Sequence, residues 1–322
     1  MRCWSRISPK CGARFYCMPQ LSIIIPVFNR AHCVLRALAS VRGQGMGDFE
    51  LLIGDDASTD GTWEVVRREF STARLARLEV NAGAAVARNA ALRIAAGEYL
   101  AFLDSDDEWM AGKLAAQLDY LEKHPEVAVC ATSHIYQLRD GRRREVIVEN
   151  PPDWSVRLQS GQPFHGASTP VVRRSVLESV GLQDESLRVL EDWDWMLRIA
   201  QKHRVHVMAE PLAVIHENSP SNADASLLST ERFLLKHDGA FSSVGAAHRR
   251  NVVSQHWENA ARCFFRHSRN REGLACVVRS LAVSPARNPA AAAVFPLACI
   301  DGLVGSRFLR QVLRARGGYS IL

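Results

Sequence analysis

The sequence predicts an α/β fold with a mostly parallel, doubly wound sheet flanked by helices, followed by a helical C-terminal extension. Three observations predict it. Short apolar, β-branched runs without alternation recur in the first third of the chain, as in strands buried on both faces. Each run is followed by a stretch whose apolar residues repeat at helical spacing. Beyond about residue 226 the pattern is helical and arginine-rich, without a second set of strands.

The alternating elements follow one another closely from the first apolar run onward. The expected strands are LSIIIPVF at 21–28, then 50–56, 75–80 and 98–104. The expected helices are 31–41, a short one within 58–70, 83–97 and 111–123. β-Branched residues fill the strands, and Gly97 is placed to end the third helix. Gly54 stands where a strand more often carries a β-branched residue, so we expect it to loosen that strand end.

After the fourth strand the alternation becomes less regular. Residues 127–148 read as a hairpin with Asp140-Gly141 at its tip, and 191–203 read as a helix. We expect a leader at 1–18 that is disordered or precedes a natural start at Met18, because it lacks the apolar block of a secretory signal. The α/β domain is then expected at 19–220 and a helical basic region at 221–322.

Charge is unevenly distributed along the chain. The net charge is +6, but residues 246–322 alone hold twelve arginines against three acidic residues. That end is therefore expected to contact something anionic. Its stretch 303–318 is amphipathic and basic, which fits a helix on an anionic membrane surface or a packed helix with a solvated arginine face. No nucleic-acid-binding motif accompanies the charge, so nucleic acid is not an expected partner.

The composition argues against a membrane-spanning helix and against two kinds of cysteine-based site. No apolar run of about eighteen residues occurs, so a membrane-spanning helix is not predicted. The eight cysteines are scattered without a C-x-x-C pair, which argues against a zinc ribbon or a thioredoxin-like site. Isolated thiols are typical of a reducing, cytoplasmic environment.

Acidic residues follow two strands of the predicted sheet. Asp55 and Asp56 end the second strand, and the fourth ends in the run Asp104-Ser105-Asp106-Asp107. Ligands of open parallel sheets bind beyond the carboxyl ends of the strands. Carboxylates gathered there repel one another unless a cation neutralises them. Mg²⁺ and Mn²⁺ take oxygen ligands and often carry a substrate's phosphates, so the sequence predicts a divalent ion bound to a diphosphate.

Helix caps, calcium loops and phosphate-binding loops account for these acids less well. A helix cap uses one Asp or Ser, not four acids. Residues 56–61 match the opening of an EF-hand, but Arg67 occupies the twelfth position, where calcium loops need Glu. No G-x-G-x-x-G follows the first strand, and 161–168 has Walker A spacing with Ala167 in place of the lysine.

Taken together, the chain from Leu21 to Glu217 resembles family 2 glycosyltransferases of the GT-A fold. The segments that carry the resemblance occur in the family's order: SIIIPVFNR, LLIGDDASTDGT, NAGAAVARNAAL, GEYLAFLDSDDEW, STPVVRRSVLESVG and EDWDWMLR. The resemblance implies a metal-dependent, inverting hexosyl or related transferase that uses Mn²⁺ or Mg²⁺. It would move a sugar from a nucleoside diphosphate, usually UDP, to a glycan or lipid-linked acceptor in cell-surface polysaccharide or glycolipid synthesis. With the basic C-terminal region, it implies a cytoplasmic protein, peripheral at the inner face of the membrane.

The resemblance also implies roles for individual residues. Asp56 would accept a hydrogen bond from the base, Arg88 would lie near the ribose or phosphates, and Asp192 would be the catalytic base beside Glu191. The remaining expected donor-site residues are Pro26, Val27, Phe28, Asn29, Arg30, Asp55, Asp104 and Ser105. The expected metal ligands are Asp106, as the second acid of the D-x-D motif, with Asp104, Asp107 and His216.

Some of these residues also suit a structural role. Glu191 and Asp192 fit the start of a helix as caps. Trp193 and Trp195 would line an acceptor pocket or pack in the core, and His165 reads as a structural histidine.

Two other functions compete with the transferase. A sugar-phosphate nucleotidyltransferase shares the general sheet but begins with a glycine-rich loop, where this chain has Pro26-Val27-Phe28. A non-catalytic nucleotide-sugar scaffold would need neither the D-x-D motif nor the Glu191-Asp192 pair.

Overall fold

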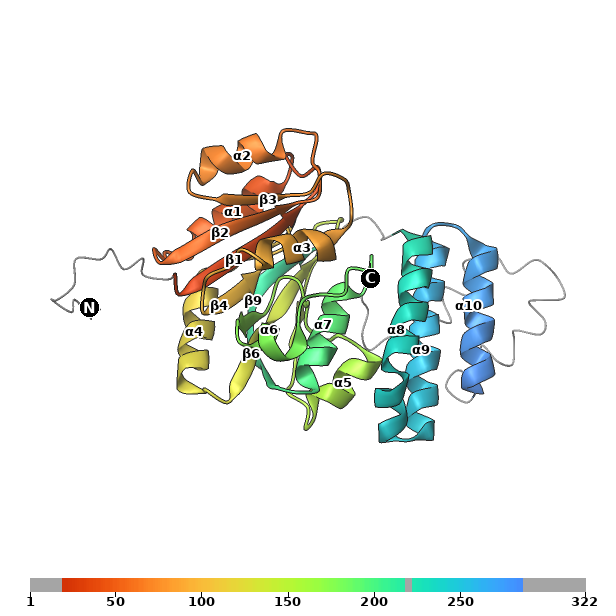
Figure 1. The fold of residues 1–322 in the computed structure, drawn as a ribbon. Coiled ribbons are helices and arrows are strands. Elements are labelled where there is room, and N and C mark those ends of the chain that lie inside the picture. Colours follow the sequence, from red (N-terminus) through yellow and green to blue (C-terminus); the bar gives the residue numbers. More distant parts are fainter. Residues whose placement is uncertain (1–18, 218–221, 286–322) are drawn as a thin grey trace.

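The fold is given by a computed structural model that describes residues 19–217 and 222–285 of the 322-residue chain (Figure 1). The predicted leader and the amphipathic stretch 303–318 lie outside the described residues. Within them, a single mixed sheet carries helices on both of its faces, and three long helices follow it.

The sheet has nine strands in the order β3-β2-β1-β4-β8-β6-β9-β5, with β7 beside β6. The strands are β1 (Leu21–Val27), β2 (Phe49–Asp55), β3 (Arg74–Arg77), β4 (Tyr99–Phe102), β5 (Glu108–Trp109), β6 (Val127–Gln137), β7 (Arg143–Val146), β8 (Val171–Arg173) and β9 (Arg204–His216). Strands β3, β2, β1, β4, β6 and β9 run in one direction, and β8, β7 and β5 run against them. The mostly parallel α/β fold is therefore confirmed, with antiparallel strands added in its second half.

Helices cover both faces of this sheet. They are α1 (Val34–Arg42), α2 (Thr62–Glu69), α3 (Ala84–Leu92), α4 (Lys113–Lys123), α5 (Trp154–Ser160), α6 (Val176–Val180) and α7 (Glu191–Ala200). Helices α1, α2 and α4 pack on one face, where Ile23 and Ile25 point, and α3, α5, α6 and α7 pack on the other, with Ile24. Because β1 is buried on both faces, its sequence shows no alternation.

The described part of the C-terminal region, residues 222–285, is helical, as predicted, in α8 (Ala223–Val244), α9 (Ala246–Arg266) and α10 (Asn270–Val283), which lie side by side in Figure 1. Phe233, Phe241 and Val252 belong to the same apolar cluster as α7, whereas α8, α9 and α10 also share a small cluster of their own that includes Ala261, Phe264 and Val277. Of the helices that the structure describes, none is both long enough and apolar enough to cross a membrane.

Two local expectations have different outcomes. The hairpin is confirmed: β6 and β7 pair antiparallel, and Gly141 at the tip has a φ of 86°. The expectation that Gly54 loosens the end of its strand is wrong. A Cβ at Gly54 would lie 2.1 Å from the carbonyl oxygen of Ala87, so this glycine lets α3 pack directly on the sheet.

A lysine is buried beneath the sheet edge. Lys113 is fully buried, donates Nζ to Gln117 Oε1 at 2.7 Å, and lies 4.6 Å from the centre of the Trp109 ring. Gln117 donates in turn to the carbonyl oxygens of Cys130 and Thr169. Burial lowers the pKa of Lys113 to about 7.

This pKa makes a prediction about stability. Between pH 7 and 10 the unfolded chain holds a proton on Lys113 that the folded chain has lost, so stability rises with pH. We expect wild type to gain about 3 kcal/mol of unfolding free energy over this range relative to Lys113→Met. Urea unfolding at several pH values measures it. Lys123 is on the same helix but exposed, so the unfolding free energy of Lys123→Met should change with pH as that of wild type does. If the difference in unfolding free energy between wild type and Lys113→Met did not depend on pH, Lys113 would not be neutral in the folded chain.

Candidate active site

The two acidic strand ends lie on one edge of the sheet, as predicted. Strands β2, β1 and β4 are neighbours and parallel, so their carboxyl ends meet at a common rim, which β6 and β9 extend. Arg30, in the loop after β1, lies 3.5 Å from Asp106 after β4. We call this edge the acidic rim, made of the residues that follow β2 and β4, Asp55–Asp56 and Asp104–Asp107.

Asp107 is the most enclosed of the acids after β4. Its side chain accepts hydrogen bonds from Ser168 Oγ at 2.6 Å and from the backbone N–H of His216 at 2.9 Å. Burial, followed by repulsion from Asp104 and Asp106, outweighs the favourable charge of His165 and raises the pKa of Asp107 to about 7. Its negative charge is therefore incompletely compensated by the protein.

His165 completes a group that suits a divalent ion. Asp104, Asp107 and His165 each offer one ligand atom, and these atoms lie within 4.8 Å of one another. His165 Nδ1 is 4.0 Å from Asp107 Oδ2 and, among the described residues, is buried without a hydrogen-bond partner. Two carboxylates and an imidazole fit Mn²⁺ better than Mg²⁺, which prefers oxygen ligands alone.

The other expected ligands face elsewhere in this structure. The imidazole Nε2 of His216 lies 2.9 Å from Glu108 Oε1, and only its backbone contacts Asp107. Asp106 faces Arg30, and burial and Asp104 raise its pKa. The nitrogen beside Asp104 and Asp107 therefore comes from His165, for which the sequence indicates only a structural role.

Arg88 connects the rim to α7. It is almost fully buried and donates to Asp104 Oδ1 at 2.7 Å and to Glu191 Oε1 at 2.8 Å. Burial opposes ionisation of Asp104, but Arg88 and then His165 hold the pKa of that carboxyl below its usual range. Burial dominates at Glu191, where it outweighs Arg88 and raises the pKa to about 7.

Asp192 lies against the loop that carries His165. A Cβ at Gly166 would come within 2.9 Å of Asp192 Oδ2, so a side chain there would collide with this carboxylate. Burial alone would lower the pKa of His165, but attraction from Asp107, Asp104 and Asp192 outweighs burial and raises the pKa. The loop 161–169 therefore carries His165 beside Asp107 and Gly166 beside Asp192.

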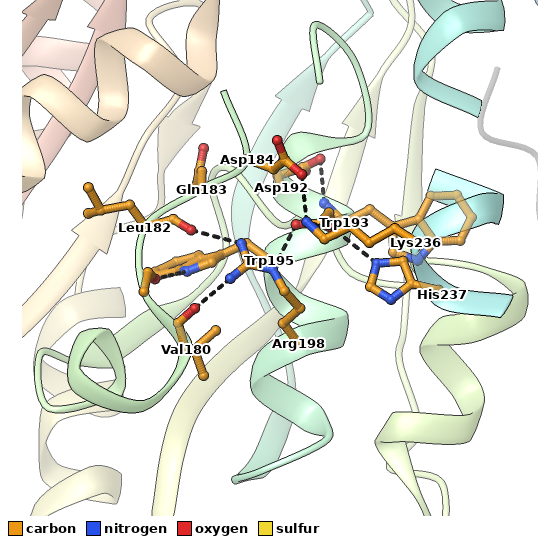
Figure 2. A network of polar contacts seen from close by, with 12 residues as sticks. Val180, Leu182, Gln183, Asp184, Asp192, Trp193, Trp195, Arg198, Lys236 and His237 are labelled. Carbon is orange, nitrogen blue, oxygen red and sulfur yellow. Dashed lines mark hydrogen bonds and ion pairs between the residues drawn. The ribbon is translucent and has the colours of Figure 1, made fainter. Parts of the chain in front are cut away.

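Helix α7, which carries Asp192 in its first turn, is held in place by polar contacts with its neighbours. Figure 2 shows Arg198 donating to the carbonyl oxygens of Val180 and Leu182, at 2.6 and 2.8 Å. In the same view, Lys236 and His237 of α8 reach across to α7. Both contact Asp194, each at 2.8 Å, and this carboxylate is fully buried and also accepts from Arg198 at 2.8 Å.

The two tryptophans of α7 are core residues, so the expectation that they line an acceptor pocket is wrong. Trp195 is fully buried, and its Nε1 donates to the carbonyl oxygen of Gly181 (Figure 2). Trp193 is 4% exposed, donates to Leu158, and stacks on His256 of α9 at 4.7 Å. Their polar N–H groups are satisfied inside the protein, which lets the indoles pack between α7 and its neighbours.

On the other side of the rim, the predicted donor residues form a network of loops. Asp56 accepts from Asn81 Nδ2 and from the N–H groups of Ala82 and Gly83, at 2.6–2.9 Å, and so fixes the entry to α3. The side chain of Asn29 accepts from the N–H of Thr59 at 2.8 Å. These bonds join the loops after β1 and β2 into one surface.

Not every predicted donor residue reaches that surface. Pro26 and Val27 are buried within β1, and Asp55 and Ser105 are also buried, so they shape the site from behind. Phe28 is 42% exposed, and Asn29 and Arg30 are partly exposed. The exposed wall of the loop therefore begins at Phe28, which corrects the expectation for Pro26 and Val27.

Comparisons with known proteins identify the family and the fold of the chain. The model of the family described as "Glycosyl transferase family 2" matches residues 22–180. The chain is 32% identical over 200 residues to a Bacillus subtilis (strain 168) protein named as a teichuronic acid biosynthesis glycosyltransferase, TuaG, with 61% of this chain and 78% of TuaG covered.

A second relative is the Escherichia coli UDP-Glc:alpha-D-GlcNAc-diphosphoundecaprenol beta-1,3-glucosyltransferase WfgD, 44% identical over 106 residues. The match covers 32% of this chain and spans 42% of WfgD, less than half of its length. Among solved structures, S. aureus TarS 1-349 in complex with UDP has a TM-score of 0.58 at 20% identity, covering 83% of this chain and 82% of that one. A likeness at that identity concerns the fold, which is of the GT-A type.

Proposed function

The chain belongs to glycosyltransferase family 2, and from this premise we propose that it moves a sugar from a UDP donor to an acceptor hydroxyl, with inversion at the anomeric carbon. The acceptor is a glycan or lipid-linked sugar of a cell-surface polysaccharide or glycolipid, and the protein works peripherally at the inner face of the membrane. The observation that carries the proposal is the position of Asp192 beside Gly166, the neighbour of His165, whose ring atoms lie close to the carboxylates of Asp104 and Asp107.

The donor would lie along the acidic rim. The linked loops after β1 and β2, with Phe28, Asn29 and Asp56, would receive the nucleoside, and Arg30 would lie towards its phosphates. The names of WfgD and of the UDP complex of TarS support a uridine donor. The domain that does this would span 19–220, followed by the helical basic region 221–322, whose described helices α8 and α9 contact α7.

The residues present also fit a divalent ion, held by Asp104, Asp107 and His165. A bound ion would neutralise negative charge on the departing diphosphate. Arg88 would keep Asp104 ionised and oriented, because it pairs with that carboxylate from within the core. Ser168 would hold Asp107 in place through its 2.6 Å hydrogen bond.

Asp192 would act as the general base. As the acceptor oxygen bonds to the anomeric carbon, its proton passes to the Asp192 carboxylate, and the bond from that carbon to the diphosphate oxygen breaks with its electron pair leaving on the diphosphate. Displacement in one step inverts the anomeric carbon, as in an inverting glycosidase with an alcohol in place of water. Glu191, held by Arg88, would position the start of α7 rather than take the proton.

Donor and metal dependence can be tested by thermal unfolding. With Mn²⁺ present, a UDP-sugar at about a hundred times its Kd should add roughly 2.7 kcal/mol of stability, seen as a rise in Tm. GDP-, dTDP- and CMP-sugars should add less. Asp107→Asn should lose the Mn²⁺-dependent part, while Asp119→Asn, exposed on α4, should retain it. Stabilisation by GDP-sugars alone would overturn the uridine assignment, and no response to any donor would favour a scaffold.

A further inference from the structure

We propose that His256 of α9 is a positioning residue for sugar transfer, because it holds the helix of the general base and the loop 161–169 in one arrangement. This inference rests on the proposed transferase function and adds the C-terminal helical region to it. His256 would act through Trp193, the residue after Asp192, and through the end of α5. We call Trp193 and His256 the stacked pair.

Helix α5 ends where the loop 161–169 begins, and it lies against both α7 and α9 (Figure 1). The last four carbonyl groups of a helix have no partner within that helix, so they need donors from elsewhere. Trp193 Nε1 donates to the carbonyl oxygen of Leu158, and His256 Nε2 donates to that of Gln159 at 3.0 Å. Two adjacent carbonyl oxygens at the end of α5 are therefore bound by one residue of α7 and one of α9.

The two donors also contact each other. The ring centres of Trp193 and His256 are 4.7 Å apart, with 30° between the ring planes. His256 is only 1% exposed, and the ring of Phe233 on α8 lies 4.8 Å from its own. Because side chains in a close-packed interior have little room to turn, this packing fixes the direction in which His256 Nε2 donates.

A second histidine of α9 contacts the same residue of α5. His248 Nε2 lies 2.8 Å from the side-chain oxygen Oε1 of Gln159, which is 3% exposed. Helix α9 therefore holds Gln159 through its backbone and through its side chain. Shortly after Gln159 the chain reaches His165, whose Nδ1 lies 4.0 Å from Asp107 Oδ2. The end of α5 thus sets where the chain enters the loop of the metal-type cluster.

The stacked pair joins the two parts of the candidate site. The backbone N–H of Trp193 donates to Asp192 Oδ1 at 2.8 Å, in the first turn of α7. Gln159 leads into the loop in which Gly166 lies beside the other oxygen of that carboxylate, Oδ2. His256 therefore contacts both segments that place the general base relative to the metal-type cluster. A shift of about 1 Å between such groups costs up to about 10²-fold in rate.

The first test separates the hydrogen bond of His256 from its ring contact. His256→Phe keeps an aromatic ring against Trp193 but cannot donate to Gln159, whereas His256→Gln keeps a side-chain N–H. Amides of 161–169 should exchange hydrogen about tenfold faster in His256→Phe, the worth of one hydrogen bond, and near the wild-type rate in His256→Gln. Phe264→Leu is the matched control: Phe264 is equally buried on α9 but packs in the cluster shared with α10, so this loop should be unchanged.

Metal binding and kinetics connect this contact to the reaction. Titration with Mn²⁺ alone, followed by the electron paramagnetic resonance signal of the free ion, should show about tenfold weaker binding for His256→Phe and wild-type binding for His256→Gln. In transfer assays His256→Phe should lower kcat by up to about 10²-fold and leave KM for the UDP-sugar unchanged, because the nucleoside loops follow β1 and β2. His248→Ala removes only the contact with the Gln159 side chain, at a half-buried position, so it should fold and show smaller changes of the same kind.

These measurements separate this inference from the proposed function. Faster exchange in 161–169, together with no Mn²⁺ binding by wild type, would refute the metal site and keep the inference that α9 holds the loop. Equal exchange of the loop in wild type, His256→Phe and His248→Ala would overturn the inference. So would equal losses of Mn²⁺ affinity in His256→Phe and Phe264→Leu, because a general loss of stability would then explain both.

Discussion

Replacing Asp192 by Asn is expected to lower the rate of sugar transfer by about 10²–10⁴-fold, the contribution of a general base. The amide has nearly the same shape but cannot take a proton from the acceptor. Because α7 is fixed by Asp194, Trp193 and Trp195, the substitution should leave the fold and UDP-sugar binding unchanged. Steady-state transfer and calorimetric donor binding, measured on the same preparation, check both parts.

Two further variants test whether Asp192, rather than another carboxylate, is the general base. Asp119→Asn removes an exposed carboxylate on α4 and should retain full activity. Glu191→Gln should reduce activity less than Asp192→Asn, because Glu191 pairs with Arg88 and acts on position rather than on the proton. If Asp192→Asn kept most of its activity while Glu191→Gln lost it, the base would be Glu191.

Replacing Asp194 by Ala is expected to destabilise the protein by about 3 kcal/mol, the lower end of the cost of breaking a buried ion pair. The fully buried carboxylate accepts from Arg198 of its own helix and from Lys236 and His237 of α8. Without it, three donors lose their common partner between α7 and α8. Urea unfolding at pH 7 measures the loss.

The same carboxylate predicts an acid dependence. Although burial opposes its ionisation, the bond from His237 and the charges of Arg198 and Lys236 lower the pKa of Asp194 to about 2. Its stabilisation is therefore complete above the unfolded pKa of about 3.9 and is lost as pH falls towards 2. The difference between wild type and Asp194→Ala should shrink between pH 4 and 2. A constant difference would mean that the loss comes from packing; Asp119→Asn again serves as the control.

Much of the fold could be predicted because its signals are local. An apolar run such as 21–28 identifies a strand buried on both faces, whatever its neighbours are. The carboxyl ends of parallel strands meet at one edge, so Asp56 and Asp104 could be placed together without coordinates. The antiparallel insertion of β8 between β4 and β6 was not predictable, because three residues carry no signal that chooses their neighbours.

The candidate site also has parts that could not be predicted from local sequence patterns. His165 could not be recognised because its loop has no period or motif, and tertiary contacts such as the bonds of Ser168 with Asp104 and Asp107 bring that loop to the rim. The direction of Trp193 and Trp195 could not be predicted either, since successive residues of α7 point in different directions. Packing against α9 and Phe102 decided that both turn inward.

The sequence by itself predicted the parallel part of the sheet and the shared edge of its acids, since these follow from strand and helix patterns, and the resemblance to the family indicated Asp192. Only the tertiary structure decided which histidine stands beside the acids and which aromatic residues are buried. The physical reason is that side-chain neighbours across long loops are fixed by packing and hydrogen bonds between elements, which no local pattern encodes.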